Sequence, residues 1–383
     1  MKICGIIVEY NPLHNGHVYH LNQVKKISGC DLLIAVMSGN FVQRGQPSLI
    51  SKEIRTKLAL QAGVDVVVEL PYLYAVSHAD LFSLGAISIL NHCGVDEIIF
   101  GSESNDSSTL LELATKIDHP HFNELLKSIM NDGYSYPEAC SKALKIITNK
   151  NTDLLANDLL GIQYIRNILH INKNIAFKTI KRRKSNYNDQ EILHEEIASA
   201  TSIRKALMKK ENVDHVIPDY TKQMLNKTKL HYWNDYFPYL KYQITSQKHA
   251  LKEIHDINEG IENAMIQHIK KETNYNQFVS SLVSKRYTKG KIQRLLTHVL
   301  NHVTKEEVQK WNIWNGPQYV RILGFKEKKT HDIKQLKKTS QVPIITNKNR
   351  NNHNLLKIDL RASEIYHLVD CERERKIPII YPD

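Results

Sequence analysis

The sequence predicts an α/β protein with a Rossmann-like, doubly wound parallel sheet, followed by a second, mainly α-helical and basic domain. Three observations support this prediction. Short apolar runs alternate with segments of helical periodicity in the first half of the chain, the first run ends in a turn containing Pro, Gly and His, and the excess positive charge lies in the second half. A chain of 383 residues also exceeds what one core usually holds, which favours two domains.

The predicted strands and helices of the first half alternate regularly. Strands are expected at residues 3–8, 31–37, 64–70 and 96–100, and helices at residues 17–27, 52–61 and 79–91. The sequence from 106 to 170 reads as mainly helical, and residues 177–180 supply a fifth strand. Because βαβ units place the carboxyl ends of parallel strands at one edge, the loops at 14–17, 38–45 and 101–104 should converge on a ligand.

The second half has a weaker pattern. A helix is expected to begin within residues 197–204, with Ser199 or Thr201 as its N-cap, and the domain boundary is placed near residue 205. The prediction is therefore a catalytic domain at 1–205 and a basic, mainly helical domain at 206–383. Helices are expected at 256–271 and 288–303, with short extended pieces at 342–346 and 377–381.

Charge is distributed unevenly along the chain. Residues 1–170 contain 13 Lys and Arg against 17 Asp and Glu, whereas residues 171–383 contain 39 against 23. This asymmetry favours a polyanionic partner, and nucleic acid fits better than a membrane because no basic amphipathic helix with a strong apolar face stands out. A basic surface that serves only solubility is the alternative.

Cysteine content and hydropathy indicate a cytoplasmic protein. The five cysteines are scattered without a CxxC pair, which is typical of reduced, packed thiols. No apolar run approaches the ~20 residues that a membrane helix needs, and the first residues read as a strand rather than a signal peptide.

The turn after the first strand has the features of a phosphate-binding turn. Pro12 stiffens the loop, Gly16 removes a side chain near the start of a helix, and His14 and His17 flank that helix N-terminus. Unpaired amides and the helix dipole favour an anion there, and imidazoles can donate hydrogen bonds to phosphoryl oxygens. Ordinary loop structure is one alternative, and a zinc site formed by His14, His17 and His20 is another, although no nearby Cys or carboxylate completes it.

The spacing HxGH resembles the signature of the nucleotidyltransferase superfamily, and several longer segments resemble the tRNA(Met) cytidine acetate ligase family. These segments are IVEYNPLHNGH at 7–17, SGNFVQRG at 38–45, FGSES at 100–104, ANDLLGIQY at 156–164, SATSIR at 199–204, KRYTKGKIQRLL at 285–296, YVRILGF at 319–325 and IDLRASEIY at 358–366. The resemblance implies a nucleotidyltransferase-type sheet and an ATP-dependent ligase. Such a ligase forms acetyl-adenylate from acetate and releases pyrophosphate. It then acetylates N4 of the wobble cytidine of elongator tRNA(Met), and Mg²⁺ is expected to accompany the pyrophosphate.

The resemblance also implies roles for individual residues. His14, His17 and Arg182 are the expected catalytic residues, with Arg183 and Arg204 as further candidates to face the phosphates. The expected ATP-binding residues are Ile7, Val8, Glu9, Tyr10, Asn11, Pro12, Leu13, His14, Asn15, Gly16, His17, Val18, Tyr19, His20, Gly101, Asn157 and Arg182. A further expectation comes from the side chains themselves, because the glycines, amides and arginine of the 38–45 loop could hold a small carboxylate or a cytosine amine. The residues expected to hold acetate or cytidine are Ser38, Gly39, Asn40, Gln43 and Arg44.

The RNA-binding surface is expected in the basic second half. Its predicted residues are Lys285, Arg286, Tyr287, Lys289, Lys291 and Arg294, and a second basic tract contains Lys326, Lys328, Lys329, Lys334, Lys337 and Lys338. A solvated amphipathic helix would explain the first set equally simply. Two other functions stay open at this stage, a small-molecule nucleotidyltransferase and a non-catalytic RNA-binding protein with a nucleotide site. No protein partner is implied.

Overall fold

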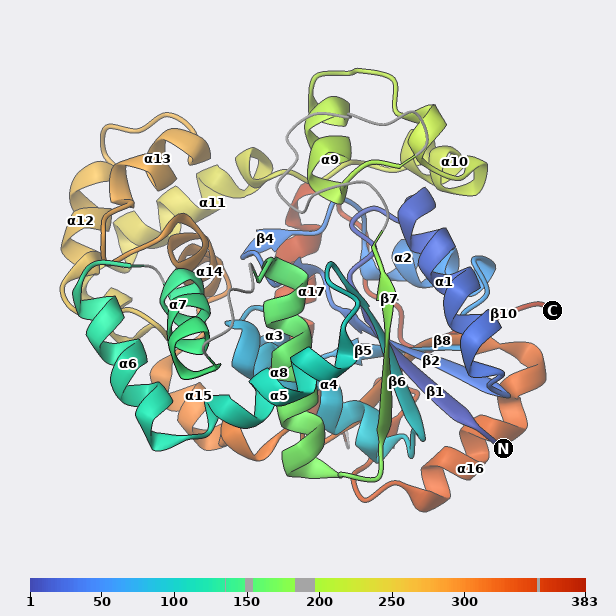
Figure 1. Ribbon diagram of the computed structural model, residues 1–383. Coiled ribbons are helices and arrows are strands. Elements are labelled where there is room, and N and C mark those ends of the chain that lie inside the picture. Colours follow the sequence, from blue (N-terminus) through green and yellow to red (C-terminus); the bar gives the residue numbers. More distant parts are fainter. Residues whose placement is uncertain (135, 149–153, 183–196, 350–351) are drawn as a thin grey trace.

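The computed structural model describes residues 1–134, 136–148, 154–182, 197–349 and 352–383 (Figure 1). The strands are β1 Ile3–Val8, β2 Leu32–Ser38, β3 Phe41–Val42, β4 Gln46–Pro47, β5 Val66–Leu70, β6 Glu97–Ser102, β7 Ala176–Lys181, β8 Val320–Lys326, β9 Ile344–Ile345 and β10 Ile379–Tyr381. The helices of the first half are α1 Asn15–Ser28, α2 Lys52–Gln61, α3 Tyr72–Ala75, α4 Ala79–His92, α5 Ser107–Ile117, α6 Pro120–Asn131, α7 Tyr136–Thr148 and α8 Ala156–Ile171. Those of the second half are α9 Ala200–Met208, α10 Asp219–Lys227, α11 Trp233–Ser246, α12 Ile261–His268, α13 Tyr275–Leu282, α14 Lys289–Leu300, α15 Lys305–Trp311, α16 Thr330–Thr339 and α17 His353–Tyr366.

The central sheet has the order β10-β8-β5-β2-β1-β6-β7, with β9 beside β8. Neighbouring strands run parallel except for β5 and β8, which are antiparallel. The predicted doubly wound, mostly parallel sheet is therefore confirmed, with one antiparallel pair that the sequence prediction does not include. The sequence prediction also lacks strand β8 altogether.

Alternate side chains of each central strand enter two different cores. Along β2, Leu32, Ile34 and Val36 pack toward α3, α4 and α8, whereas Leu33, Ala35 and Met37 pack toward α1, α2, α9 and α10. This alternation is the ordinary consequence of the two-residue period of a strand. Figure 1 shows the two helical layers on either side of the sheet. Burial on both faces explains why the strands appear in the sequence as unbroken apolar runs.

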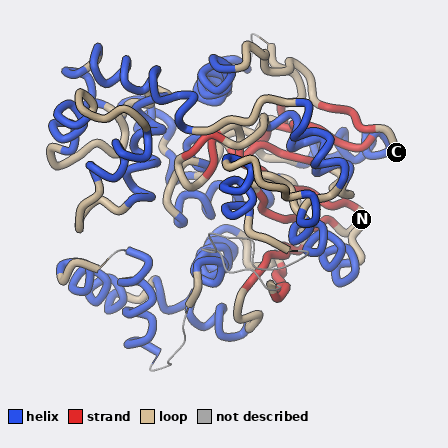
Figure 2. The backbone as a smooth tube through the Cα atoms, turned by 90° about the horizontal axis from the view of Figure 1, so that it is seen from above, coloured by secondary structure: helices blue, strands red, loops and turns tan. Residues whose placement is uncertain are grey.

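The sheet takes strands from both sides of residue 205. Three of its strands, β8, β9 and β10, follow that residue, while helices α11 to α14 lie together to one side of the sheet (Figure 1). Figure 2 shows that the end of the molecule opposite the two termini consists mainly of helices. The sheet is therefore continuous across the predicted domain boundary. Whether residues 1–205 and 206–383 fold as separate units stays a prediction. A helical C-terminal portion is present, as predicted.

A buried ionic network joins these strands to the first half of the chain. Lys52 on α2 contacts Glu69 at 2.7 Å and Glu374 at 2.5 Å, and Arg321 on β8 contacts the same two carboxylates at 2.9 Å each. The two cations hold the pKa of Glu374 down to about 2, against the opposing effect of burial. Arg321 interrupts the apolar run of β8, and its burial is tolerated because both carboxylates accept its charge.

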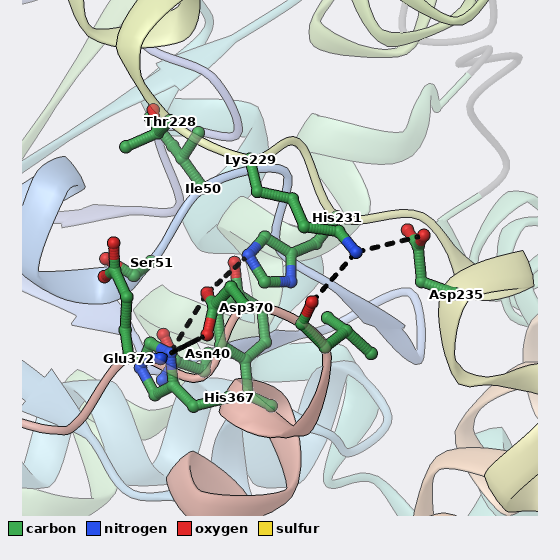
Figure 3. Close-up of polar contacts among 12 residues, drawn as sticks. Asn40, Ile50, Ser51, Thr228, Lys229, His231, Asp235, His367, Asp370 and Glu372 are labelled. Atoms are coloured by element: carbon green, nitrogen blue, oxygen red, sulfur yellow. Dashed lines mark hydrogen bonds and ion pairs between the residues drawn. The ribbon is translucent and has the colours of Figure 1, made fainter.

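A cluster of polar contacts joins the C-terminal segment at residues 366–370 to the loop before α2 (Figure 3). Asp370 lies between two buried imidazoles, with its carboxylate 3.0 Å from His231 Nε2 and 2.9 Å from His367 Nδ1. The backbone amide of His231 donates to the carbonyl of Leu49 at 2.8 Å, and the Tyr366 hydroxyl donates to the carbonyl of Ser48 at 2.9 Å. Segments that are far apart in the sequence therefore meet beside the 38–45 loop.

Across the residues that the structure describes, we find no helix with the length and apolar character needed to cross a bilayer.

Candidate active site

A cavity of about 230 Å³ opens at the carboxyl ends of β1, β6 and β7. The predicted site residues that line it are Ile7, Val8, Glu9, Tyr10, Asn11, His14, Gly16, His17, Tyr19, His20, Gln43, Arg44, Gly101, Asn157, Arg182 and Arg204. The predicted residues that do not line it are Pro12, Leu13, Asn15, Val18, Ser38, Gly39 and Asn40. Arg183 lies outside the described residues. Three loops that are distant in the sequence thus converge on one space, as expected from the topology of the sheet.

The turn between β1 and α1 is held in shape by polar contacts from distant residues. Tyr10 has a φ of 47°, a left-handed conformation that bulky side chains seldom adopt. Nη1 of Arg204 donates to the carbonyl of Asn11 at 2.6 Å, and Oδ1 of Asn11 accepts from the amide of Leu49 at 2.7 Å. Arg204 therefore braces the turn as well as lining the cavity.

The two imidazoles of the HxGH motif stack at the N-terminus of α1. Their ring centroids lie 3.7 Å apart at an interplanar angle of 26°. The backbone amide of His14 donates to Nδ1 of His17 at 3.3 Å, so the proton of a neutral His17 sits on Nε2. His17 can then donate a hydrogen bond from Nε2 to an oxygen of a bound ligand. A Cβ on Gly16 would lie 2.9 Å from Cε1 of His14, so this glycine makes room for the His14 ring.

His14 is buried, and His17 and His20 on α1 are partly buried, beside cationic side chains. Burial, followed by the charges of Arg182 and Arg204, lowers the pKa of His14 to about 3. Burial and Arg182 lower the pKa of His20 to about 4, and burial with His14 and Arg182 also lowers the pKa of His17 well below its usual value. The site is therefore electropositive without needing protonated imidazoles, which suits the binding of an anion.

Arg182 follows β7 and faces the histidines across the cavity. A Cβ on Gly101 would lie 3.4 Å from Cγ of Arg182, so the arginine side chain lies over the end of β6. Its backbone amide donates to the carbonyl of Ser102 at 3.0 Å, which fixes the start of the loop. The buried Nε of Arg182 has no hydrogen-bond partner among the described residues. A buried guanidinium donor of this kind requires an acceptor, and a phosphate oxygen would supply one.

Asn157 belongs to a cap that joins α8 to the FGSES turn. Nδ2 of Asn157 donates to the carboxylate of Glu103, and the same carboxylate accepts the amide of Asp158 at 2.9 Å. The Asp158 carboxylate in turn accepts the hydroxyl of Ser102 and the amide of Glu103 at 3.0 Å. This reciprocal cap places Asn157 at the cavity wall and fixes its orientation.

The 38–45 loop divides into a packed part and a part that lines the cavity. Ser38, Gly39 and Asn40 are covered, and the Asn40 amide group contacts the amide of Lys52 at 2.7 Å and the hydroxyl of Ser363 at 3.0 Å. Gln43 and Arg44 reach the cavity from the hairpin β3–β4. Of the five residues expected to hold acetate or cytidine, only these two are placed to do so.

Sequence reasoning missed Arg55, a fully buried residue of α2. Nη1 of Arg55 donates to the carbonyls of Glu9 at 2.8 Å and Ser38 at 2.9 Å, and Nη2 donates to the carbonyl of Gly39. One guanidinium therefore connects the ends of β1 and β2. An arginine on the apolar face of a predicted helix is the signal that could have identified it. The apolar cavity wall, formed by Phe82, Phe100, Leu160 and Tyr164, was also missed.

The residues predicted to bind tRNA differ in exposure. Lys285, Arg286 and Lys289 are exposed. The ring of Tyr287 is only 4% exposed and its hydroxyl donates to the carbonyl of Asn258 at 2.6 Å, so in this conformation it cannot stack on a base. Lys291 lies over that ring at 4.2 Å, and burial lowers the pKa of Arg294.

The described side chains offer two groups of possible metal ligands, His255 with Asp256 and His298, and His367 with Asp370 and Glu372. His14, His17 and His20, the alternative zinc set of the sequence, form neither group.

A sheet of this topology, with an HxGH helix N-terminus and a facing arginine at its carboxyl edge, defines a nucleotide-binding protein of the nucleotidyltransferase class. Comparisons with known proteins agree. A family model described as HIGH Nucleotidyl Transferase matches residues 1–377. The tRNA(Met) cytidine acetate ligase of Geobacillus sp. (strain WCH70) is 39% identical over 389 residues, covering 98% of this chain and 96% of the relative. The ligase of the same name from Bacillus subtilis (strain 168) is 39% identical over 384 residues, covering 96% and 92%.

Solved structures lead to the same family. The apo crystal structure of Thermotoga maritima TmcAL matches with a TM-score of 0.91 and 32% identity, and the two chains cover each other completely. A structure of that protein bound with alpha-thio ATP matches with a TM-score of 0.87, again over both whole chains. The chain therefore belongs to the HIGH nucleotidyl transferases and, among them, to the tRNA(Met) cytidine acetate ligase family.

Proposed function

We propose that this protein is an ATP-dependent ligase that converts acetate and ATP into acetyl-adenylate and pyrophosphate. It then transfers the acetyl group to N4 of the wobble cytidine of elongator tRNA(Met). The observation that carries the proposal is the HxGH histidine pair at the N-terminus of α1 with Arg182 across the same cavity. The names of the relatives, and the ATP analogue bound to the Thermotoga maritima protein, support it. ATP and tRNA, two of the three substrates of such a reaction, are consistent with a cytoplasmic protein.

The first step needs stabilisation of charge on the phosphates. A carboxylate oxygen of acetate attacks the α-phosphorus, the bond from that phosphorus to the bridging oxygen breaks, and pyrophosphate leaves. We place Nε2–H of His17 and the amides at the start of α1 on one side of the phosphates, and the guanidinium of Arg182 on the other. Because these donors are fixed before ATP binds, they need little rearrangement as charge moves to the leaving group.

In the second step the N4 amine of cytidine attacks the carbonyl carbon of the mixed anhydride. The bond from that carbon to the adenylate oxygen breaks, AMP leaves, and the amine loses a proton. Gln43 and Arg44 are the residues we assign to the acetyl group and the incoming base, because they line the ATP cavity from a separate loop. Orientation of the amine replaces a covalent enzyme intermediate in this scheme.

Glu9 is the one carboxylate that we find along the cavity among the described residues, and it already accepts the amide of Gln43 at 2.8 Å. The described part of the cavity wall therefore offers no cage of carboxylates for Mg²⁺. We propose that phosphate oxygens and water supply most of the ligands of Mg²⁺, with Glu9 close by, as is common for this cation at nucleotide sites.

Incubation of the protein with ATP, radiolabelled acetate and total tRNA tests the proposal directly. Acetate-derived label in tRNA, located on cytidine after digestion, supports the ligase. Transfer of adenylate from ATP to a metabolite, without labelled tRNA, would instead support a small-molecule nucleotidyltransferase. Binding of tRNA without any turnover of ATP would leave a non-catalytic RNA-binding protein.

The variant His17→Ala tests the assigned catalytic role. We expect acetate-dependent exchange between pyrophosphate and ATP to fall by about 10²–10³-fold, the usual cost of removing one donor to a developing charge. Binding of tRNA should change little. His121→Ala on α6, where the imidazole is exposed, serves as the matched control. Wild-type exchange rates in His17→Ala would show that this imidazole does not act on the phosphates.

A further inference from the structure

Two histidines and an aspartate converge outside the ATP cavity, where the loop after the 3-10 helix Lys248–Glu253 meets α14. Nε2 of His255 lies 3.6 Å from Oδ1 of Asp256, and Nε2 of His298 lies 3.9 Å from Oδ2 of the same carboxylate. The three ligand atoms lie within 4.8 Å of one another. Neither the HxGH chemistry nor the RNA surface uses these residues.

The imidazole of His298 is buried with one nitrogen lacking a partner among the described residues. Its side chain is 1% exposed, and Nε2 makes no hydrogen bond there. On the other side of the ring, Nδ1 lies 3.2 Å from the hydroxyl of Tyr72, and that hydroxyl donates its proton to the carbonyl of Thr297 at 3.1 Å. In the tautomer in which Nδ1 donates to that hydroxyl, Nε2 has a lone pair that a cation can bind, on the side of the ring where the Asp256 carboxylate lies.

A cation placed between Nε2 of His298 and the facing carboxylate oxygen of Asp256 would bind both of these acceptors. A ring whose Nδ1–H is held by a hydrogen-bonding partner while Nε2 points at other ligands is the arrangement that metal-binding histidines usually have. We propose that His255, Asp256 and His298 form a binding site for a divalent transition-metal cation, with Zn²⁺ as the ion that this donor set fits best.

The geometry is close to what zinc requires. Ligand bonds of roughly 2.0–2.1 Å place neighbouring ligand atoms of a tetrahedron about 3.3 Å apart. His255 Nε2 lies 3.6 Å from Oδ1 and His298 Nε2 lies 3.9 Å from Oδ2 of Asp256, and one ligand atom from each of the three residues lies within 4.8 Å of the other two. The Asp256 side chain is 41% exposed and the His255 side chain is 20% exposed. Small rotations of these side chains therefore close the site, and solvent can deliver the ion and supply a fourth ligand.

A bound metal ion would link the loop before α12 to α14, and through α14 it would stabilise the contact of the helical portion with the sheet. His255 and Asp256 belong to the loop before α12, and His298 belongs to α14, which reaches α3 through Tyr72. Two interactions within the protein could replace a metal at these residues. The positive charge of Arg294 interacts with the Asp256 carboxylate, and the backbone of Val76 forms a hydrogen bond with the ring of His298. A measurement of metal binding by the purified protein distinguishes a metal site from these internal contacts.

The test uses the full chain, stripped with a chelator and titrated with Zn²⁺ against a chromophoric competitor. We expect one tightly bound ion, a tetrahedral Co²⁺ absorption spectrum on substitution, and a rise in melting temperature on adding Zn²⁺. Asp256→Asn should weaken binding at least about 100-fold, the upper range for loss of an outer partner, and should abolish the thermal shift. Asn tolerates the φ of 66° at this position, so the variant should fold.

His249→Gln, at an exposed position of the same 3-10 helix, is the matched control and should bind Zn²⁺ like the wild type. His255→Gln provides a second variant that removes a partly exposed ligand. Failure of the wild type to bind Zn²⁺ would overturn the proposal. Equal affinity in Asp256→Asn and the wild type would overturn it too, because the ion would then sit elsewhere, for instance on His14, His17 and His20.

Discussion

At the scale of single residues, the HxGH turn uses each side chain for more than one purpose. His17 completes the cap of α1 by accepting the amide of His14, and this contact also directs its Nε2 proton away from the backbone. The sequence predicts that Gly16 lets the nucleotide approach the helix, and the structure adds that a side chain there would meet the His14 ring. The motif therefore located the cavity correctly, although the sequence explained only part of the role of Gly16.

The lowered pKa values of His14 and His20 predict how stability depends on pH. Both groups titrate near pH 3–4 when folded and near about 6.5 when unfolded, so the unfolded chain binds more protons between these values. Stability of the ligand-free protein should be full above about pH 6.5 and should decline as the pH falls toward 4. Denaturant titrations over that range check this, and His20→Gln should reduce the slope.

Other buried histidines contribute to the same decline, since burial lowers the pKa of His231 to about 4. His20→Gln should thus flatten the pH dependence without removing it. The exposed His121 offers the control, because its replacement by Gln should leave the profile as it was. An unchanged profile in His20→Gln would mean that His20 is accessible to protons in the folded state.

At the scale of elements, the hairpin β3–β4 depends on a close approach to α14. Gly45 has a φ of 67°, and a Cβ there would lie 2.2 Å from the backbone nitrogen of Arg294. Nε1 of Trp233 donates to the carbonyl of Gly45 at 2.9 Å, which ties the hairpin to α11 as well. The sequence predicts that the 38–45 loop holds acetate or cytidine, whereas the structure gives Gly45 at the end of this loop a packing role.

Replacement of Gly45 by Ala should therefore detach the hairpin from α14. Gly94 has a similar φ of 66°, and a Cβ added at Gly94 would meet no atom within 4 Å. Gly94→Ala thus isolates the cost of the backbone conformation, roughly 1–2 kcal/mol. We expect Gly45→Ala to lower the free energy of unfolding by a further ~1–3 kcal/mol through overpacking, measured by urea denaturation. If the two variants lose the same free energy of unfolding, α14 moves away from the added methyl group without a measurable cost.

At the scale of the whole molecule, the sheet order predicts that residues 1–205 do not fold alone. A fragment ending there lacks β8, which pairs with β5 along Val66–Glu69, and it leaves Lys52 and Glu69 without Arg321 and Glu374. We expect broad, non-cooperative thermal unfolding of the fragment, measured by circular dichroism, beside a sharp transition of the full chain. A cooperative transition of the fragment would instead establish the predicted domain boundary.

The two basic tracts lie in different places relative to the cavity. Lys285, Arg286 and Lys289 belong to the helical portion, whose α14 packs on the cavity hairpin. The other tract surrounds α16, beside the amino ends of the parallel strands (Figure 1). It lies there because β8 runs antiparallel to β5, so that β8 ends next to the start of β5, where the amide of Lys326 donates to the carbonyl of Asp65. Only the first tract is on the side of the molecule where the cavity opens.

Reversal of Lys285, Arg286 and Lys289 to Glu should weaken tRNA binding and lower its salt dependence. The slope of log K against log salt should fall by about 0.7–0.9 for each phosphate that the variant no longer neutralises. Formation of acetyl-adenylate should survive. Reversal of Lys328, Lys334 and Lys338 near α16, which are equally exposed, is the matched control. An unchanged salt slope in the first variant would remove that surface from the tRNA interface.

Sequence patterns alone were enough to predict the strands β1, β2, β5, β6 and β7, the helix that follows the HxGH turn, and most residues of the cavity wall. These features are local, since apolar periodicity, Gly and Pro act within a few residues. Tertiary structure alone decided that β8 and β10 extend the sheet, that Ser38, Gly39 and Asn40 pack while Gln43 and Arg44 line the cavity, and that Tyr287 is buried. Each of these depends on pairing or burial between segments far apart in the chain, which no local pattern records.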